Sequence, residues 1–128
     1  MKRLIATLAL ATVALAAAAC GSSNAAPPAS PAAPADPNAP AVTADQLKFD
    51  KAEVQVPAGK PFQLTFTNKE SAPHNVAIYT DSSASQSLFQ GEIFSSATKV
   101  YEVPALAAGS YFFRCDVHPD MAGTIVAK

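Results

Sequence analysis

The sequence predicts an all-β fold, a Greek-key β-sandwich of about seven to eight strands, from three observations. Apolar and polar side chains alternate along short segments, as in the stretch FQLTFTN at 62–68. Val, Ile, Tyr, Phe and Thr are frequent in these segments, whereas Pro, Gly, Ser and Asp are frequent between them. No longer window has a helical stripe, so the stretches 44–48 and 82–88 could each form one turn of helix at most.

Six segments are the clearest strands, and turn residues fill the gaps between them. The strand segments are 47–56, 62–68, 74–80, 98–103, 110–115 and 123–128. The gaps are 57–61, 71–73, 81–87, 104–109 and 119–123. Because side chains alternate between the faces of a strand, Tyr111, Phe113 and Cys115 share one face. Cys115 therefore points inward where its strand ends, at the end of the sandwich where loops gather.

Residues 1–19 have the composition of an export signal. A short basic start precedes an apolar run at 4–19 that is too short for a comfortable transmembrane helix. The run ends in AAAC at 17–20, which resembles the lipobox of bacterial lipoproteins and would make Cys20 the lipidated first residue of the mature chain. Ordinary cleavage after the same alanines is the alternative, and it would leave Cys20 free. We expect an extracytoplasmic protein, in the periplasm or at the cell surface, anchored to a bacterial membrane through Cys20.

Two further parts follow the signal, a linker at 20–42 and one domain at 43–128. The linker is rich in Ala, Pro, Ser and Asn and has almost no large apolar side chain, so it cannot form a packed core. The domain has seven Lys and Arg against nine Asp and Glu, a net charge of about −2 with neutral His. Since it has no basic run and no aromatic residues interleaved with basic ones, we expect no nucleic-acid partner. We expect the protein to be a monomer.

The domain contains four side chains that suit a soft metal ion, His74, Cys115, His118 and Met121. They are both His of the chain and the only Cys and Met of the domain. Exported proteins normally pair their cysteines, yet Cys115 has no partner if Cys20 is lipidated. Two imidazoles, a thiolate and a thioether are the ligand set of a mononuclear blue copper centre. The Pro, Asp and Gly residues around Met121 allow the chain to turn back so that both sulfurs can reach one metal.

Two stretches resemble the cupredoxins. They are PHNV at 73–76 and YFFRCDVHPDMAGTIV at 111–126, and the short Cys-x₂-His-x₂-Met spacing is most similar to the amicyanin-like members. The resemblance covers essentially 47–128 and implies a copper-binding Greek-key sandwich. Plastocyanin-like relatives have four residues between the second His and the Met, where this chain has two.

The resemblance also implies roles for individual residues. His74, Cys115 and His118 would bind one copper ion in a plane. Met121 would be the axial ligand, although the shortened loop makes a position in the core the alternative for it. Asn75 would join the two ligand loops, with its backbone amide directed at the Cys115 sulfur.

Each of these residues also has an ordinary structural explanation. A single buried Cys is usually part of a core, a single Met packs, and a single His lies on the surface. Their joint occurrence at ligand spacing favours the metal site, since independent coincidences would have to use every His and every soft sulfur in the domain. Some atypical copper relatives recruit a carboxylate, but Glu92 is expected to be a solvated loop charge.

The predicted site suits electron transfer better than catalysis. Its four ligands leave no obvious open position for a substrate, and the sequence has no acid/base pair or activated nucleophile. We expect a non-enzymatic carrier of single electrons, cycling between Cu(I) and Cu(II), that docks transiently with redox proteins near His118. Small residues, Ala72, Pro73, Pro119 and Ala122, would surround that imidazole. The alternative is a module for copper delivery or sequestration, and a copper enzyme with an open coordination site is a third class.

Overall fold

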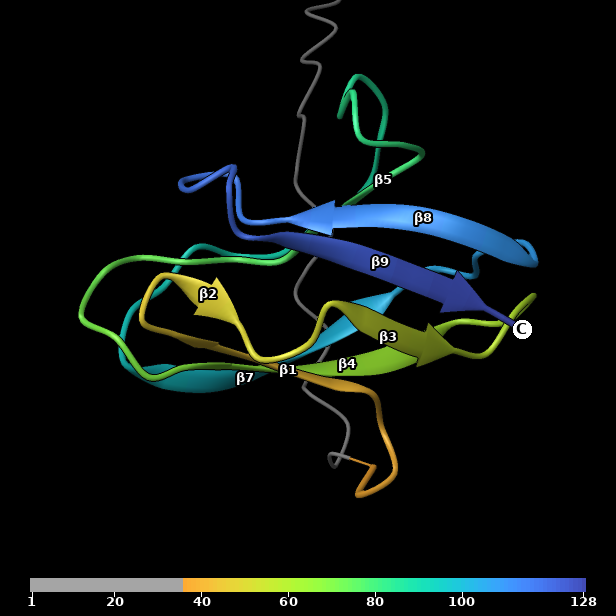
Figure 1. Cartoon of the computed structure of the whole chain (residues 1–128). Coiled ribbons are helices and arrows are strands. Elements are labelled where there is room, and N and C mark those ends of the chain that lie inside the picture. The colour runs from red at the N-terminus through yellow and green to blue at the C-terminus, as the bar shows by residue number, and fades with distance from the viewer. Residues whose placement is uncertain (1–35) are drawn as a thin grey trace, which may run out of the picture. The chain divides into compact units, whose positions relative to one another are not determined.

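Two β-sheets form the part of the chain that the structure describes, residues 36–128. In this computed structural model the two sheets pack face to face, and the described range contains no helix (Figure 1). The all-β sandwich that the sequence predicts is confirmed, with nine strands in this range where about seven to eight were expected. The strands are β1 Ala41–Asp45, β2 Lys48–Phe49, β3 Glu53–Val56, β4 Phe62–Asn68, β5 Ala77–Tyr79, β6 Ser87–Gln90, β7 Ala97–Val103, β8 Gly109–Arg114 and β9 Ala122–Ala127.

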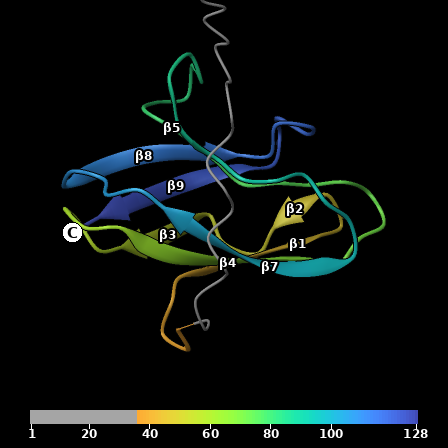
Figure 2. The same ribbon diagram turned by 180° about the vertical axis from the view of Figure 1, so that it is seen from behind.

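Both sheets are mixed. One sheet has the order β2-β1-β4-β7, and the other has the order β3-β9-β8-β5-β6. β1 pairs with β4 and β3 pairs with β9 in parallel, whereas the other neighbours are antiparallel. The chain crosses between the sheets after β2, β3, β4, β6 and β7, so strands that are distant in sequence lie side by side (Figure 2).

The core lies between the sheets and follows the alternation that the sequence predicts. Along β4 the side chains of Phe62, Leu64 and Phe66 are buried, whereas the residues between them are only partly buried. The ring of Phe66 packs edge-on against Phe94, with the two centroids 5.4 Å apart. Each large apolar side chain buried in this way stabilises the fold by about 1.5–3 kcal/mol. The core therefore gives the loops at the ends of the sandwich a rigid base.

Several elements differ from the sequence prediction. The predicted strand at 47–56 is two strands, β2 and β3, which lie in different sheets. β1 and β6 are short and have weak local patterns, and they are strands because β1 pairs with β4 and β6 pairs with β5. β1 includes Ala41 and Val42, which the sequence analysis assigns to the linker. Neither 44–48 nor 82–88 forms a helical turn. In the first stretch Gln46 and Leu47 have φ values of 53° and 55°, as expected for the two central residues of a tight hairpin between β1 and β2.

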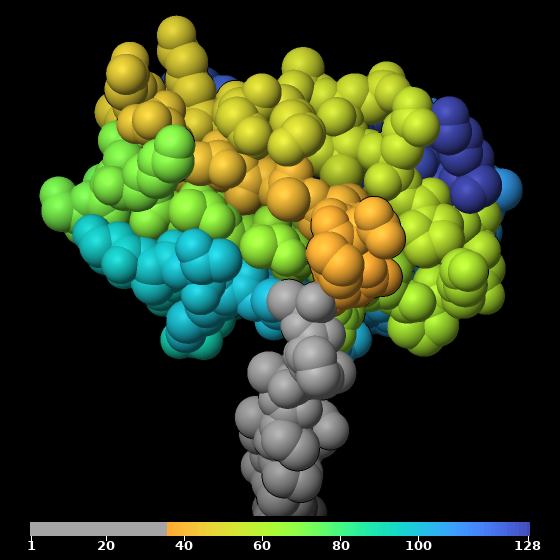
Figure 3. Space-filling view, turned by 90° about the horizontal axis from the view of Figure 1, so that it is seen from below, coloured from red at the N-terminus to blue at the C-terminus, as the bar shows by residue number. Residues whose placement is uncertain are grey.

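Residues 36–40, at the start of the described range, pack against the four-stranded sheet. They are orange in Figure 3, beside the yellow-green residues that precede and begin β4. The backbone N–H of Asp36 donates to the side-chain carbonyl of Gln63 over 3.1 Å. The carbonyl of Pro40 accepts a hydrogen bond of 2.9 Å from the backbone of Thr65. These bonds extend the sheet edge slightly beyond β1.

The remaining N-terminal predictions concern residues that the structure does not describe. The export signal at 1–19, Cys20 and the linker as far as residue 35 lie outside the described range. Between residues 36 and 128, no helix is long and apolar enough to cross a membrane.

Candidate metal centre

His74 lies in the loop that follows β4, and its backbone is fixed by a pair of hydrogen bonds to Phe94. The N–H of each residue donates to the carbonyl of the other over 3.1 Å, which forms an isolated antiparallel bridge. The sequence analysis places His74 in a strand, but β5 begins only at Ala77. The imidazole is 0% exposed. A buried imidazole with a fixed backbone has a defined direction, which suits a metal ligand.

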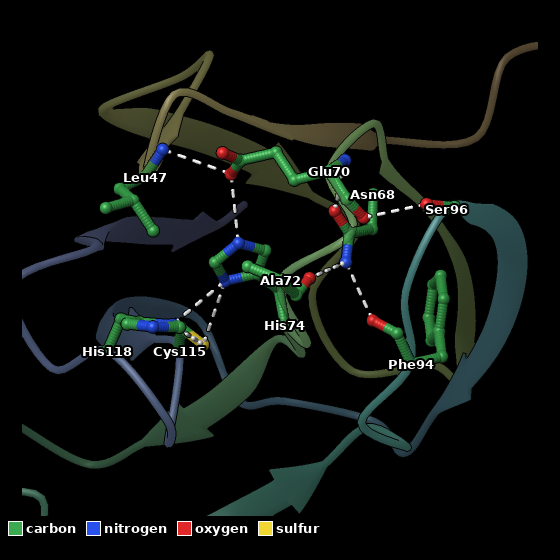
Figure 4. Close-up of polar contacts among 9 residues, drawn as sticks. All are labelled: Leu47, Asn68, Glu70, Ala72, His74, Phe94, Ser96, Cys115 and His118. Carbon is green, nitrogen blue, oxygen red and sulfur yellow. Dashed lines mark hydrogen bonds and ion pairs between the residues drawn. The ribbon is translucent and has the colours of Figure 1, made fainter.

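The side chain of Asn68 shapes this loop from within. Its amide donates to the carbonyls of Ala72 and Phe94 over 2.8 and 2.7 Å, and its side-chain oxygen accepts a hydrogen bond from the Glu70 backbone (Figure 4). Asn68 is only 2% exposed, so its polar groups depend on these partners. One side chain thus satisfies two backbone groups of the loop that carries His74 and ties that loop to the segment of Phe94.

The second ligand loop follows β8 and turns back on itself, as the sequence predicts. The N–H of Cys115 donates to the carbonyl of Met121, and the N–H of Met121 donates to the carbonyl of His118, both over 2.9 Å. Cys115 is fully buried and Met121 is 2% exposed, whereas His118 is partly exposed. The loop therefore closes through its own backbone and leaves one of the two imidazoles in reach of solvent.

Three donor atoms from the two loops converge on one point (Figure 4). The Cys115 sulfur lies 3.7 Å from Nδ1 of His74 and 3.9 Å from Nδ1 of His118, and the two nitrogens are 3.1 Å apart. Ligand bonds of about 2.0 Å to nitrogen and about 2.3 Å to sulfur place three coplanar ligand atoms about 3.5 Å (nitrogen to nitrogen) and about 3.7 Å (nitrogen to sulfur) apart. The sulfur–nitrogen distances therefore have the spacing of a trigonal metal site, while the two nitrogens lie closer together than such a site needs.

Glu70 explains why the nitrogen of His74 that faces the cluster is free to bind a metal. Nε2 of His74 lies 2.9 Å from Oε2 of Glu70, and the backbone N–H of Leu47 donates to the same oxygen over 3.0 Å (Figure 4). An ionised carboxylate only accepts hydrogen bonds, so the imidazole proton is on Nε2 and Nδ1 carries a lone pair. Carboxylates commonly orient metal-binding imidazoles in this way. Glu70 is not among the residues predicted from the sequence, although a carboxylate four residues before the first His was the available signal.

Asn75 and Asp116 join the two ligand loops. The side-chain carbonyl of Asn75 accepts a hydrogen bond of 2.8 Å from the Asp116 backbone, and its amide donates to the Asp116 carboxylate over 2.9 Å. Tyr79 and Gln90 also donate to this carboxylate. Burial opposes ionisation of Asp116, but the hydrogen bonds from these side chains outweigh it and hold the pKa of Asp116 below its usual value. The contact of the Asn75 backbone amide with the Cys115 sulfur stays a prediction.

Two further residues were singled out from the sequence, Met121 and Glu92. Met121 is buried at the end of the ligand loop, in the same apolar core as Cys115. Its backbone closes the loop, while a bond from its thioether to a metal stays a prediction. Glu92 is largely exposed and forms an ion pair with Lys99, as expected of a solvated loop charge.

Curated relatives of the chain are bacterial amicyanins. Amicyanin-alpha of Methylorubrum extorquens is 32% identical over 83 residues, which cover 65% of this chain and 66% of the relative. Amicyanin of Paracoccus versutus is 30% identical over 91 residues, which cover 71% of this chain and 66% of the relative. The chain thus spans a little under two thirds of the length of each.

Solved structures share the fold. Reduced auracyanin from Roseiflexus castenholzii has a TM-score of 0.61 at 20% identity, and the match covers 69% of this chain and 94% of auracyanin. Amicyanin from Paracoccus versutus has a TM-score of 0.58 at 28% identity, with coverage of 74% and 86%. The Cu(I) form of an amicyanin variant has a TM-score of 0.58 at 26% identity, with coverage of 74% and 87%.

A family model confirms what the fold and the site indicate. The model of the cupredoxin-like domain matches residues 6–127, which include all nine strands and both ligand loops. The protein therefore belongs to the cupredoxin family.

Proposed function

We propose that the protein carries single electrons through one copper ion bound by His74, Cys115 and His118, with Met121 as axial ligand. The observation that carries the proposal is the convergence of one buried cysteine sulfur and two imidazole nitrogens within 4.8 Å of one another. Thiolate and thioether favour Cu(I), and imidazole suits both oxidation states. The Cu(I) form of the amicyanin variant supports the choice of metal.

The protein's own contribution is to hold the ligands still while the copper gains and loses an electron. Glu70 and the Phe94 bridge fix His74, and the backbone bonds of the second loop fix the positions of Cys115 and Met121. Ligands that move little when the copper changes charge lower the reorganisation energy of each electron transfer. Four protein ligands also leave no open position for a substrate, which favours an electron carrier over an enzyme.

The exposed end of the site is suited to transient docking of a redox protein. Three large apolar side chains are notably exposed in the described chain, and each is linked to a ligand loop. Val117 lies in the second loop, Leu47 contacts Glu70, and Ile93 precedes the Phe94 bridge. We place the docking surface here, around the partly exposed His118, where electrons would enter and leave.

Substitution of the thiolate tests the proposal most directly. Copper-loaded protein should show an intense visible absorption band, and Cys115→Ser should lose both this band and most of the copper affinity. Met121→Leu is the matched control, since it alters the same loop but keeps the three coplanar ligands and should stay coloured. An unchanged band in Cys115→Ser would remove that residue from the site.

The axial position of Met121 has its own test. Met121→Gln introduces a harder oxygen donor that stabilises Cu(II), so the reduction potential should fall. Met121→Leu removes the donor and dries the site, so the potential should rise. If neither substitution moves the potential, Met121 is a core residue only.

Copper delivery or sequestration is the second candidate, because the partial exposure of His118 would allow a ligand to be exchanged. Repeated reduction and oxidation in the presence of a copper chelator separates the two functions. An electron carrier keeps its copper through many cycles, whereas a delivery protein loses it on the timescale of transfer.

Export and anchoring complete the proposal. Residues 1–19 would direct the chain out of the cytoplasm, and a lipidated Cys20 would hold the domain at the membrane by the linker. Amicyanin relatives of the chain support an extracytoplasmic location. In fractionated bacterial cells, Cys20→Ser should move the protein from the membrane fraction to the soluble fraction; an unchanged distribution would contradict the anchor.

A further inference from the structure

Asp116 is the residue directly after the thiolate ligand, and its carboxylate is held by side chains from three parts of the fold. Oδ1 accepts a hydrogen bond from the Tyr79 hydroxyl. Oδ2 accepts hydrogen bonds from the amides of Asn75, at 2.9 Å, and Gln90, at 2.7 Å. None of these contacts involves the side chain of a proposed metal ligand. The position of the Asp116 carboxylate therefore needs a separate explanation.

The three side chains that donate to the Asp116 carboxylate are neutral, so they do not neutralise its charge. Neutral dipoles stabilise an ionised carboxylate but do not cancel its charge at a distance. Arg114 forms an ion pair with it, but Nε of Arg114 lies 3.8 Å from Oδ1, too far for a hydrogen bond. The guanidinium instead lies over the ring of Tyr79, 5.0 Å from its centroid. Asp116 therefore contributes a negative charge beside the metal site, which the guanidinium of Arg114 offsets only in part.

The carboxylate is also poorly screened by water. The Asp116 side chain is only 16% exposed, and its two neighbours toward the metal, Cys115 and Asn75, are fully buried. In such surroundings a unit charge acts over several ångströms with an effective dielectric constant of about 20, well below that of water. Asp116 follows the proposed ligand Cys115 in the chain, and its carboxylate is bonded to Asn75, which follows the proposed ligand His74.

We infer that Asp116 is an electrostatic tuning residue, whose fixed negative charge stabilises the oxidised, more positive metal centre and lowers its reduction potential. The inference rests on the proposed function of the site. Asp116 acts through space and through Asn75, and it does not bind the metal. Tyr79 has the opposite influence, because its hydroxyl dipole directs a positive end at the carboxylate and weakens its field.

The test compares three variants of the full-length, copper-loaded protein at neutral pH. Asp116→Asn removes the charge and keeps the shape, and at a fixed electrode potential the ratio of reduced to oxidised protein should rise about tenfold, or about 59 mV for one electron. Tyr79→Phe removes one donor and should lower that ratio. Glu102→Gln is the control, since it removes one charge from the opposite end of β4 and β7, about 17 Å along the strands from Asn68, and should leave the ratio unchanged.

Opposite shifts in Asp116→Asn and Tyr79→Phe would support the inference, because a loosened loop would move both variants in the same direction. Shifts of the same sign, or no shift in Asp116→Asn, would overturn it. An electron paramagnetic resonance spectrum of each oxidised variant reports whether the ligand set is intact. If the wild-type protein itself lacks the thiolate absorption band, the proposed function fails; if the wild type is blue and the shifts are absent, only the role of Asp116 fails.

Discussion

The two ligand loops hold their imidazoles by different means. The first loop is held by other parts of the chain: Asn68 bonds the loop backbone, Phe94 pairs with the backbone of His74, and Glu70 bonds the far nitrogen of the imidazole. In the second loop the backbone bonds to itself, from Cys115 to Met121 and from Met121 to His118. His74 is consequently buried and oriented, whereas His118 is partly exposed.

Because of this difference, we expect the imidazoles of His74 and His118 to have different roles although they are chemically identical. A buried imidazole held by a carboxylate can keep its direction when the metal changes charge. An imidazole on a short surface loop gives electrons a path to a docked partner and solvent a path to the metal. We expect the first histidine to determine the integrity of the site and the second to determine its accessibility.

Removal of each imidazole should have the largest effect and should distinguish the two loops. His74→Gly and His118→Gly should both lose the visible absorption band of the copper protein. Free imidazole should restore the band in His118→Gly, because solvent reaches the vacated position. It should fail to do so in His74→Gly, where the position is buried and the Glu70 carboxylate loses one of its two donors.

The measurement is an imidazole titration of each copper-loaded variant, followed by visible absorption. Val117→Gly, in the same loop as His118, controls for the backbone freedom that glycine adds and should stay blue without imidazole. Equal rescue of both histidine variants would show that the two positions are equally accessible and would remove the contrast between the loops.

The next largest effect concerns Glu70, whose carboxylate supports His74 in the first loop and has no contact with the second loop's imidazole. Glu70→Ala should lower copper affinity about 10–100-fold, as is usual when the partner of a metal-binding imidazole is removed. Glu70→Gln keeps an oxygen that accepts from Nε2 of His74 and should stay close to the wild type. Competition with a coloured copper chelator measures the affinities, with Glu92→Ala, an exposed carboxylate, as the unchanged control. An unaffected Glu70→Ala variant would mean that Asn68 and the Phe94 bridge suffice to fix His74.

The sequence predicts the ligand types better than it predicts their support. Both His and the only Cys of the domain could be identified because soft donors are rare in the chain and occur close together. The alternation along β4 predicts the core because every second residue there points to the same face of the sheet. Such features depend on neighbours in the sequence or on composition, and both can be read without the fold.

The supporting contacts depend on the folded loops instead. Glu70 meets His74 because Asn68 bends the chain between them, and no periodic pattern marks a loop of that kind. The hydrogen bonds to Asp116 come from side chains up to 41 residues away. β6 becomes a strand through pairing with β5, although its serine-rich surroundings favour a turn. Contacts between distant segments were therefore the part that local reasoning missed.

The smallest expected effect concerns the junction of the two loops, and it is measured in the metal-free protein. Hydrogen bonds lower the pKa of Asp116 below its usual 3.8, so the ionised carboxylate favours the folded state. Its contribution is complete above the unfolded-state pKa and is lost as the pH falls through the lower, folded-state pKa. Asp116→Asn should therefore cost about 1 kcal/mol in the free energy of unfolding at neutral pH, and the cost should shrink in acid.

Urea unfolding at neutral and acidic pH measures both free energies, with exposed Asp120→Asn, in the same loop, as the control. A cost in Asp116→Asn that is independent of pH would show that the loops are joined by the backbone bond to Asn75 alone and not by the charge of the carboxylate.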